Sequence, residues 1–213
     1  MRDDSAADDA AHADHPTGPE NPDGTLPRRP DAAPGEPAEF DSGDAEDARQ
    51  IQEFWEVARI RAGLMRTAVV TGMSSEATVP PPAWSFGDNP RLADELLDLV
   101  LNGDKRATTS YLLEYERDAD PLPQQGDLAI LLDGAGRPRA LIRTTGVDVL
   151  PFGEVTADQA YAEGEGDRSL ATWRRDHETV FRRSMEGPGI EFSDDLVVVF
   201  ERFELLYPQS SDR

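Results

Sequence analysis

The chain has 213 residues and a formal net charge of −22 at pH 7, which allows one domain with a tail or two very small domains. Such acidity excludes non-specific duplex-DNA binding, which depends on a cationic surface, and leaves open only a locally basic cleft for a short RNA or a nucleoside. The absence of cysteine excludes disulfide bonds and cysteine-ligated metals, and with three histidines we expect no histidine-rich zinc site.

The sequence also predicts that the protein does not enter a membrane. No apolar run approaches the ~20 residues that a spanning helix needs. The first residues, Met1 to Ser5, lack the basic and apolar segments of a signal peptide. We therefore expect a cytoplasmic protein.

Residues 1–48 are rich in proline, aspartate and alanine, and Leu26 and Phe40 are nearly their only large apolar residues. Such a segment cannot bury enough apolar surface to offset the entropy of ordering, so we predict a disordered acidic tail. The ordered domain is expected over 49–207, with a short C-terminal tail at 208–213.

Two helices are predicted in the first half of the domain. Apolar residues at helical spacing predict the first over 48–66. The second starts at Pro90, with Asp88 or Asn89 as its cap and Gly103 at its end.

Trp84 and Phe86 lie between these two helices. Two aromatic side chains this close can stack on a nucleic-acid base, or they can plug the hydrophobic core. The core position is the commoner outcome for such a pair, and both interpretations stay open.

Lys105 is the only lysine of the chain, in which all other basic residues except histidine are arginine. Arginine stays protonated, whereas a desolvated lysine can lose its proton and act as a base. The hydroxyls of Thr108, Thr109 and Ser110 follow, and a lysine beside a hydroxyl can activate a nucleophile. An exposed lysine without function fits the composition equally well.

Three strands are predicted next from the alternation of apolar and polar residues. They cover 107–115, 127–132 and 137–150, and an Asp-Gly pair between the last two is a hairpin signal. Arg143 and two other arginines occupy alternate positions of the third strand. One face of this hairpin is therefore basic at one end, although a solvated strand edge is the commoner outcome.

An acidic loop follows a short helix predicted near 157–162. Glu163, Glu165 and Asp167 alternate there with two glycines. Clustered carboxylates can bind a divalent metal, act as acid or base, or orient a lysine. The spacing is not that of an EF-hand loop, and a plain flexible acidic loop is the competing interpretation.

A long helix is predicted from its cap at Ser169 to about Ser184, followed by a last strand over 196–206. The segment Arg168–Arg183 holds five basic and two acidic residues. It is the best candidate for a phosphate-contacting surface, but counter-charge for the acidic loops explains it nearly as well. His177 falls on the apolar face, which favours a packed, hydrogen-bonded histidine over a catalytic one.

Four segments stand in an order that is specific to one family. They are the run from Leu101 to Ser110, the turn Pro121–Asp127, the segment Pro151–Thr156, and the loop Glu163–Leu170 with Trp173 and His177 after it. Over roughly residues 52–207 they resemble the ASCH domain family. The resemblance implies an α+β fold, a small PUA-like β-barrel flanked by helices, with a cleft proposed to bind RNA.

The resemblance also implies roles for individual residues. Some members are reported as amidohydrolases that remove the acetyl group from cytidine acetylated on its exocyclic amine. These members look like they use a lysine, a threonine three residues later and a glutamate from a downstream loop. Lys105 and Thr108 match the first two. The glutamate maps to Glu163, with Glu165 as the close alternative. This chain is longer than those members, so its substrate stays open.

The first functional hypothesis is therefore an N(4)-acetylcytidine-type amidohydrolase that needs no cofactor. Lys105 would take a proton from Thr108 or from a water, and Glu163 or Glu165 would hold its ammonium form. Backbone amides or Arg143 would stabilise the oxyanion.

Two other hypotheses come from different chemistry. A ribonuclease acting on single-stranded RNA would hold a divalent metal with Glu163, Glu165 and Asp167. A non-catalytic RNA-binding module would bind without turnover. The candidate nucleic-acid contacts are Trp84, Thr109, Ser110, Tyr111, Arg168, Arg174 and Arg175.

Overall fold

The computed structural model describes residues 42–64, 79–185 and 191–209. Most of the predicted acidic tail and the last four positions, 210–213, lie outside the described residues, so the disorder of the tail stays a prediction. None of the helices described is long and apolar enough to cross a membrane.

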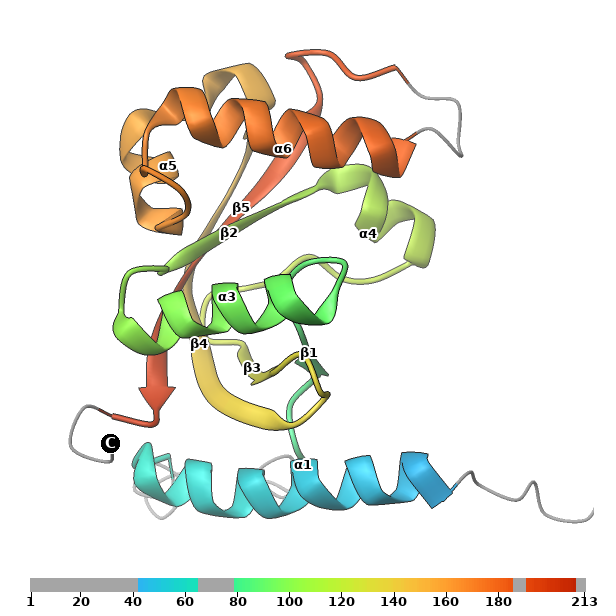
Figure 1. Cartoon of the computed structure of the whole chain (residues 1–213), viewed down its shortest axis with the longest axis vertical. Coiled ribbons are helices and arrows are strands. Elements are labelled where there is room, and N and C mark those ends of the chain that lie inside the picture. Colours follow the sequence, from blue (N-terminus) through green and yellow to red (C-terminus); the bar gives the residue numbers. More distant parts are fainter. Residues whose placement is uncertain (1–41, 65–78, 186–190, 210–213) are drawn as a thin grey trace, which may run out of the picture. The chain divides into compact units, whose positions relative to one another are not determined.

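The described residues form five α-helices, a short 3-10 turn and one five-stranded sheet (Figure 1). In chain order the elements are α1 (Ser42–Arg61), β1 (Ala83–Trp84), α3 (Pro90–Asn102), β2 (Ala107–Tyr111), α4 (Leu112–Asp118), β3 (Leu128–Leu132), β4 (Pro138–Pro151), η2 (Phe152–Glu154), α5 (Ala157–Glu163), α6 (Leu170–Met185) and β5 (Val197–Tyr207). The strand order is β1-β3-β4-β5-β2, and β1 pairs parallel to β3 while the other pairs are antiparallel. The predicted α+β class is confirmed.

Three helices cover separate parts of the sheet. Successive side chains of a strand point to opposite faces, so Leu141 of β4 shares a buried cluster with Trp55 of α1, and Ile142 shares another with α3. Under α6, Phe181 packs edge-on against Tyr111 of β2, with ring centroids 5.4 Å apart. Helices α1, α3 and α6 therefore each cover a different part of the sheet.

Most predicted elements are confirmed to within about two residues. The capping residues explain why both ends of α3 could be predicted from the sequence. The side chain of Asn89 accepts a hydrogen bond from the Leu92 N–H at 3.0 Å, and Pro90 occupies the first turn. Gly103 ends the helix with a left-handed φ of 79°.

Helix α1 differs from the helix predicted over 48–66 at both ends. It begins earlier, where the carboxylate of Glu46 and the guanidinium of Arg49 form an ion pair one turn apart at 2.6 Å. It also ends earlier, because Gly63 takes a left-handed φ of 73° just after it.

The strand predicted over 107–115 is wrong after Tyr111, where the chain turns into α4. The residues of α4 are strong helix formers, and this local preference wins over the alternating pattern. The Tyr115 hydroxyl lies 2.9 Å from the Ser110 Oγ, which fastens α4 to the end of β2. Ala119 ends the helix in a left-handed conformation.

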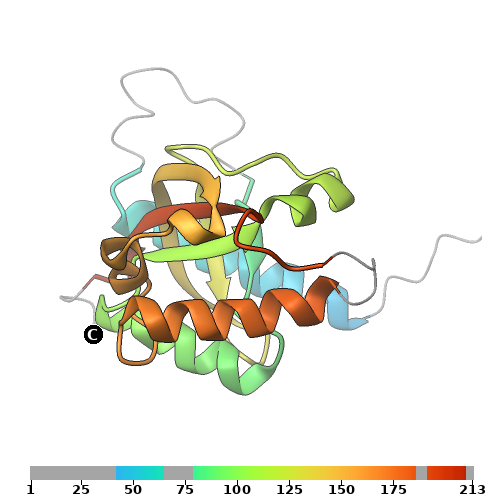
Figure 2. The same cartoon turned by 90° about the horizontal axis from the view of Figure 1, so that it is seen from above.

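The segment between α3 and β2 is fastened to the end of α5, as Figures 1 and 2 show for the start of β2. The Arg106 N–H donates to the carbonyl of Ala162 at 2.8 Å. Gly164 has a φ of 74°, and a Cβ on it would lie 2.3 Å from the Asp104 carbonyl oxygen. Lys105 sits between these two contacts and is thus held against α5.

Gly164→Ala should be more destabilising than Gly136→Ala. Both glycines have a left-handed φ, but a Cβ at Gly136 would meet nothing within 4 Å. We expect a loss of about 1–2 kcal/mol at Gly136 from backbone strain alone, and about 2 kcal/mol more at Gly164 from the added clash. Urea unfolding of both variants measures the difference, and equal losses would show that α5 does not press on the Lys105 segment.

Candidate functional site

Lys105 is a buried charge, not the exposed lysine that composition alone allows. Its N–H and that of Asp104 both donate to the Leu99 carbonyl at the end of α3, which turns the chain inward. The residue is only 2% exposed. A buried ammonium needs compensating partners, since moving an ion out of water costs several kcal/mol.

Two carboxylates compensate the ammonium of Lys105. Its Nζ donates to the Glu165 Oε1 at 2.5 Å and to the Glu163 Oε2 at 3.3 Å. The Glu163 side chain is 1% exposed and that of Glu165 is 32% exposed. The ring of Phe86 lies under the ammonium, with its centroid 5.2 Å from Nζ. Sequence could not choose between the two glutamates, and both bind Lys105.

Glu163 is the last residue of α5 and is held from two other elements, β2 and α6. Its Oε1 accepts from the Thr109 Oγ1 of β2 and from the Trp173 Nε1 of α6, each at 2.6 Å. Its Oε2 lies 3.5 Å from the His177 Nε2. Both carboxylate oxygens therefore have partners, as a buried carboxylate requires.

Charge around Glu163 shifts two pKa values. Burial pushes the pKa of Glu163 upward, but the charge of Lys105 and the neighbouring His177 and Thr109 outweigh it and lower the pKa to about 2. Burial lowers the pKa of His177, yet its interaction with Glu163 outweighs that and raises the pKa above 6.5. The carboxylate thus stays charged across the physiological range.

His177 combines packing with contact to this cluster. Its ring stacks on Trp173 with centroids 4.2 Å apart, and its Nδ1 lies 3.1 Å from the Trp173 carbonyl oxygen. The packed, hydrogen-bonded histidine expected from its position on the apolar face of α6 agrees with these contacts. The Glu163 contact was not foreseen.

Strand β2 divides the three predicted hydroxyls between two sites. Thr109 points to Glu163, whereas Thr108 and Ser110, at alternate positions, line a cleft of about 870 Å³ on the other side. Among the described residues no hydrogen bond joins Thr108 to Lys105. The structure thus brings Lys105, Glu163 and Glu165 together and leaves Thr108 apart from them.

The cleft lies between the two edge strands of the sheet. Trp84 at the edge strand β1 and Thr108 at the edge strand β2 both line it, so the sheet curls around the cleft. Thr144 of β4 and Glu201 of β5 line it from the middle of the sheet. Sequence reasoning missed Glu201 as a site residue, although a carboxylate that follows Val197 and Val199 on the same side of a strand was a usable signal.

Phe86 separates the Lys105 cluster from this cleft. The Phe86 ring, which lies under the Lys105 ammonium, packs edge-on against Trp84 with centroids 4.8 Å apart. Phe86 is a core residue, while Trp84 is half-buried and faces the cleft. The core interpretation thus describes Phe86, while stacking of Trp84 on a base stays a prediction.

Two other predicted site residues lie elsewhere. Tyr111 is 7% exposed and packs under α6, so its ring is not available to a nucleic-acid base. The Arg143 guanidinium pairs with Glu204 across the strands at 2.6 Å, on the exposed surface and away from the Lys105 cluster. Tyr111 therefore belongs to the core, and Arg143 lies at the surface in a pair with Glu204.

The arginines proposed as phosphate contacts all have protein partners. Arg168 pairs with Asp104 at 2.6 Å, Arg174 donates to the Gly153 carbonyl at 2.7 Å, and Arg175 pairs with Asp176. Counter-charge for acidic neighbours, the alternative considered from sequence, therefore describes this helix. An arginine in an exposed ion pair, such as Arg175 with Asp176, can exchange its carboxylate for a phosphate at low cost in free energy.

The carboxylates of the acidic loop do not converge on one point. Asp167 accepts from the Ser169 N–H at 2.9 Å, at the start of α6, while Glu163 and Glu165 face Lys105. Within the part of the chain that the structure describes, no three histidine or acidic side chains are grouped as metal ligands.

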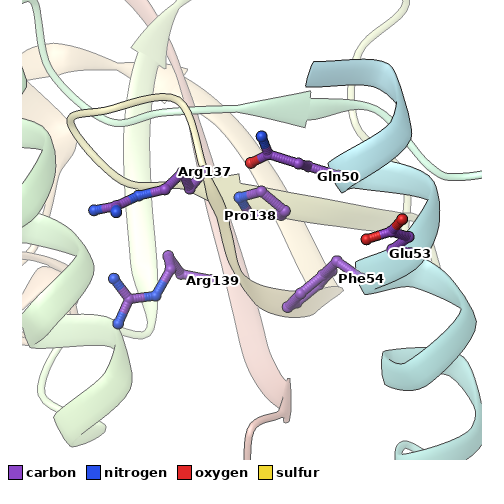
Figure 3. Close-up of a pocket in the computed structure, with 6 residues that line it drawn as sticks. All are labelled: Gln50, Glu53, Phe54, Arg137, Pro138 and Arg139. Atoms are coloured by element: carbon purple, nitrogen blue, oxygen red, sulfur yellow. The ribbon is translucent and has the colours of Figure 1, made fainter. Parts of the chain in front are cut away.

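A second hollow lies between α1 and the β3–β4 hairpin (Figure 3). It is lined by Gln50, Glu53, Phe54, Arg137, Pro138 and Arg139. Figure 3 shows both guanidinium groups extending away from α1, and each binds the buried Asp133, at 3.0 and 3.2 Å. This hollow offers little to an anion.

Comparison with known proteins identifies the region that carries both sites. A family model described as the ASCH domain matches residues 82–207. An ASCH domain structure from Lactobacillus crispatus JV V101 is 32% identical with a TM-score of 0.58, covering 70% of this chain and 95% of that one. Protein EF3133 from Enterococcus faecalis V583 is 29% identical with a TM-score of 0.60, covering 75% and 91%. No curated protein matches.

Replacement of Glu163 should change how stability depends on pH. Because the pKa of Glu163 is lowered from 4.5 to about 2 on folding, its stabilisation is complete above pH 4.5 and is lost as the pH falls toward 2. Wild type should exceed Glu163→Gln by up to about 3 kcal/mol near neutral pH, and the two should converge near pH 2. Urea unfolding across this range measures it.

Glu204→Gln is the matched control, because Glu204 forms an ion pair on the surface. Its stability should run parallel to that of wild type within about 1 kcal/mol. A difference between wild type and Glu163→Gln that is the same at both ends of the pH range would contradict the assigned role of the buried carboxylate.

Proposed function

The chain belongs to the ASCH domain family, and on that premise we propose that it binds RNA or a modified nucleoside and hydrolyses an N-acyl group from it. The substrate type is that of N(4)-acetylcytidine, an amide on an exocyclic amine. Lys105 and Glu163 act in the reaction without a cofactor, in a cytoplasmic protein that takes no duplex DNA.

The observation that carries this proposal is the buried ammonium of Lys105 between two carboxylates. An ion pair with both members almost fully buried adds little to stability compared with apolar residues of the same volume. The pKa of Glu163 is lowered to about 2, and strongly perturbed groups concentrate at functional sites. A cleft of about 870 Å³, separated from the Lys105 cluster by Phe86, offers room for a nucleoside.

The reaction needs a nucleophilic water, a base and a proton for the leaving amine. Lys105 gives one proton to Glu165, 2.5 Å away, and the resulting amine takes a proton from the attacking water. The carbonyl carbon gains the hydroxide oxygen, the C–N bond breaks, and the amine of the base leaves with a proton returned by Lys105. Glu165 then gives its proton back to Lys105, which restores both groups. The products are a carboxylic acid and the free amine.

A substrate can reach Lys105 only if the Glu165 side chain moves aside. The cluster reaches solvent through Glu165, which is 32% exposed, and Phe86 separates it from the cleft. Gly164 and Gly166 flank Glu165, both with left-handed φ angles, so the backbone on either side of it tolerates rearrangement.

Two rival functions make different predictions. A ribonuclease that holds a metal with Glu163, Glu165 and Asp167 loses support, because Glu163 and Glu165 pair with Lys105 while Asp167 binds the Ser169 N–H. A non-catalytic nucleoside- or RNA-binding module is supported by the cleft and by Trp84, and it would bind without turnover.

Lys105→Arg should reduce kcat/KM for N(4)-acetylcytidine at least about 100-fold, because arginine keeps the charge but does not act as a base. The matched control is the reverse exchange next to it, Arg106→Lys. The Arg106 guanidinium is exposed and, within the part of the chain that the structure describes, bonds only to the Gly103 carbonyl. Arg106→Lys should keep wild-type turnover, with or without EDTA. Equal activity of Lys105→Arg and wild type would refute the lysine mechanism.

Thr108→Val and Thr109→Val separate the two hydroxyls. The family resemblance assigns the reacting hydroxyl to Thr108, whereas Thr109 holds Glu163 at 2.6 Å. We expect Thr109→Val to lower kcat about tenfold or more and to lower stability by about 1–3 kcal/mol, because a buried carboxylate loses a donor. Thr108→Val should raise KM without loss of stability, and a lowered kcat in Thr108→Val alone would return the catalytic role to Thr108.

A further inference from the structure

The polar lining of the cleft is concentrated on the face of the sheet opposite the Lys105 cluster. Thr108 and Ser110 come from β2, Thr144 from β4 and Glu201 from β5. The Tyr115 hydroxyl joins them from α4 through its contact with Ser110. Polar groups from four elements therefore converge on one concave surface, as in a site that orients a small molecule.

Glu201 occupies the centre of this surface. It is the direct cross-strand partner of Thr108 on β2 and of Val147 on β4. Its Oε1 accepts a hydrogen bond from the hydroxyl of the buried Thr144, which fixes the carboxyl group. Its Oε2 has no hydrogen-bond partner among the described residues, so one fixed oxygen is left for a ligand.

The charge of the cleft restricts what it can hold. Its lining includes the carboxylates of Asp120, Asp127 and Glu201, and among the described residues no lysine, arginine or histidine lines it. Burial raises the pKa of Glu201, which keeps this carboxyl from being as strongly acidic as an exposed one. A phosphate would meet only like charge here.

The aromatic lining favours a flat ligand. Trp84 is half-buried at the edge of the cleft and is held edge-on by Phe86, so its face is fixed. A base stacked on an aromatic face gains affinity that does not depend on which base it is. The hydrogen bond at the ring edge then selects the base.

We propose that Glu201 is the residue that recognises the ligand, accepting a hydrogen bond from the exocyclic amino N–H of a base, and that the cleft therefore takes an uncharged nucleoside in preference to a phosphorylated one. The inference rests on the proposed function for the choice of a nucleoside. The inference goes beyond the proposed function because it names Glu201 as the group that recognises the base and because it excludes the phosphate backbone from the cleft.

The test measures equilibrium binding of cytidine and of cytidine 5′-monophosphate by calorimetry. Neither contains an acyl group, so binding is measured apart from turnover. Wild type should bind cytidine at least about tenfold more tightly than the monophosphate. Glu201→Gln should weaken cytidine binding at least about tenfold, because the acceptor loses its negative charge and an amide NH2 group replaces one of its two oxygens. Glu204→Gln, on the same strand but outside the cleft, should bind like wild type.

Unfolding of Glu201→Gln in urea checks that the fold is kept, and we expect a midpoint at or above that of wild type, since a half-buried carboxyl is replaced by a neutral amide. Cytidine binding by Glu201→Gln as tight as by wild type would overturn the inference. So would a monophosphate that binds as tightly as cytidine, or no cytidine binding at all.

The two proposals fail in different ways. If Lys105→Arg keeps full hydrolysis while the binding pattern holds, the hydrolase mechanism is wrong and Glu201 still reads the nucleoside. If hydrolysis depends on Lys105 while Glu201→Gln binds normally, the reading role is wrong and the hydrolase proposal stands.

Discussion

The buried ion pair of Lys105 and Glu163 is the constraint on which the surrounding structure depends. Two opposite charges removed from water must be held at short range and fully hydrogen-bonded, or they destabilise the fold. Three elements meet that demand. The end of α5 supplies Glu163, β2 supplies Thr109 and α6 supplies Trp173 and His177. The packing of both helices on β2 is therefore an electrostatic requirement as well as a hydrophobic one.

Much of the fold could be predicted from sequence because its signals are local. Asn89, Pro90 and Gly103 delimit α3, and the Thr156 capping box begins α5. The strand that was extended past Tyr111 shows the limit of such signals, since period-2 alternation and helix propensity conflict there. The exact residue at which a strand or helix ends depends on which of the two local preferences the tertiary contacts support.

The candidate site was predictable in part, for a different reason. Lys105 was distinctive because the chain uses arginine everywhere else, and both loop glutamates do reach it. Which hydroxyl faces the lysine depends on where β2 starts, because a shift of one residue exchanges the two faces. The environment of Glu201 depends on strand register across β2 and β5, which no local pattern contains.

Helix α1 lies outside the region that the family model matches, yet it covers part of the core. Trp55 and Ala58 of α1 bury Ile130, Leu141 and Leu206 of the sheet. The segment that the family model matches, residues 82–207, is therefore shorter than the segment that packs together. A fragment cut at the family boundary would present a contiguous apolar surface to water, and such surfaces drive self-association. Helix α1 thus covers an apolar part of the sheet that the matched segment alone would leave exposed.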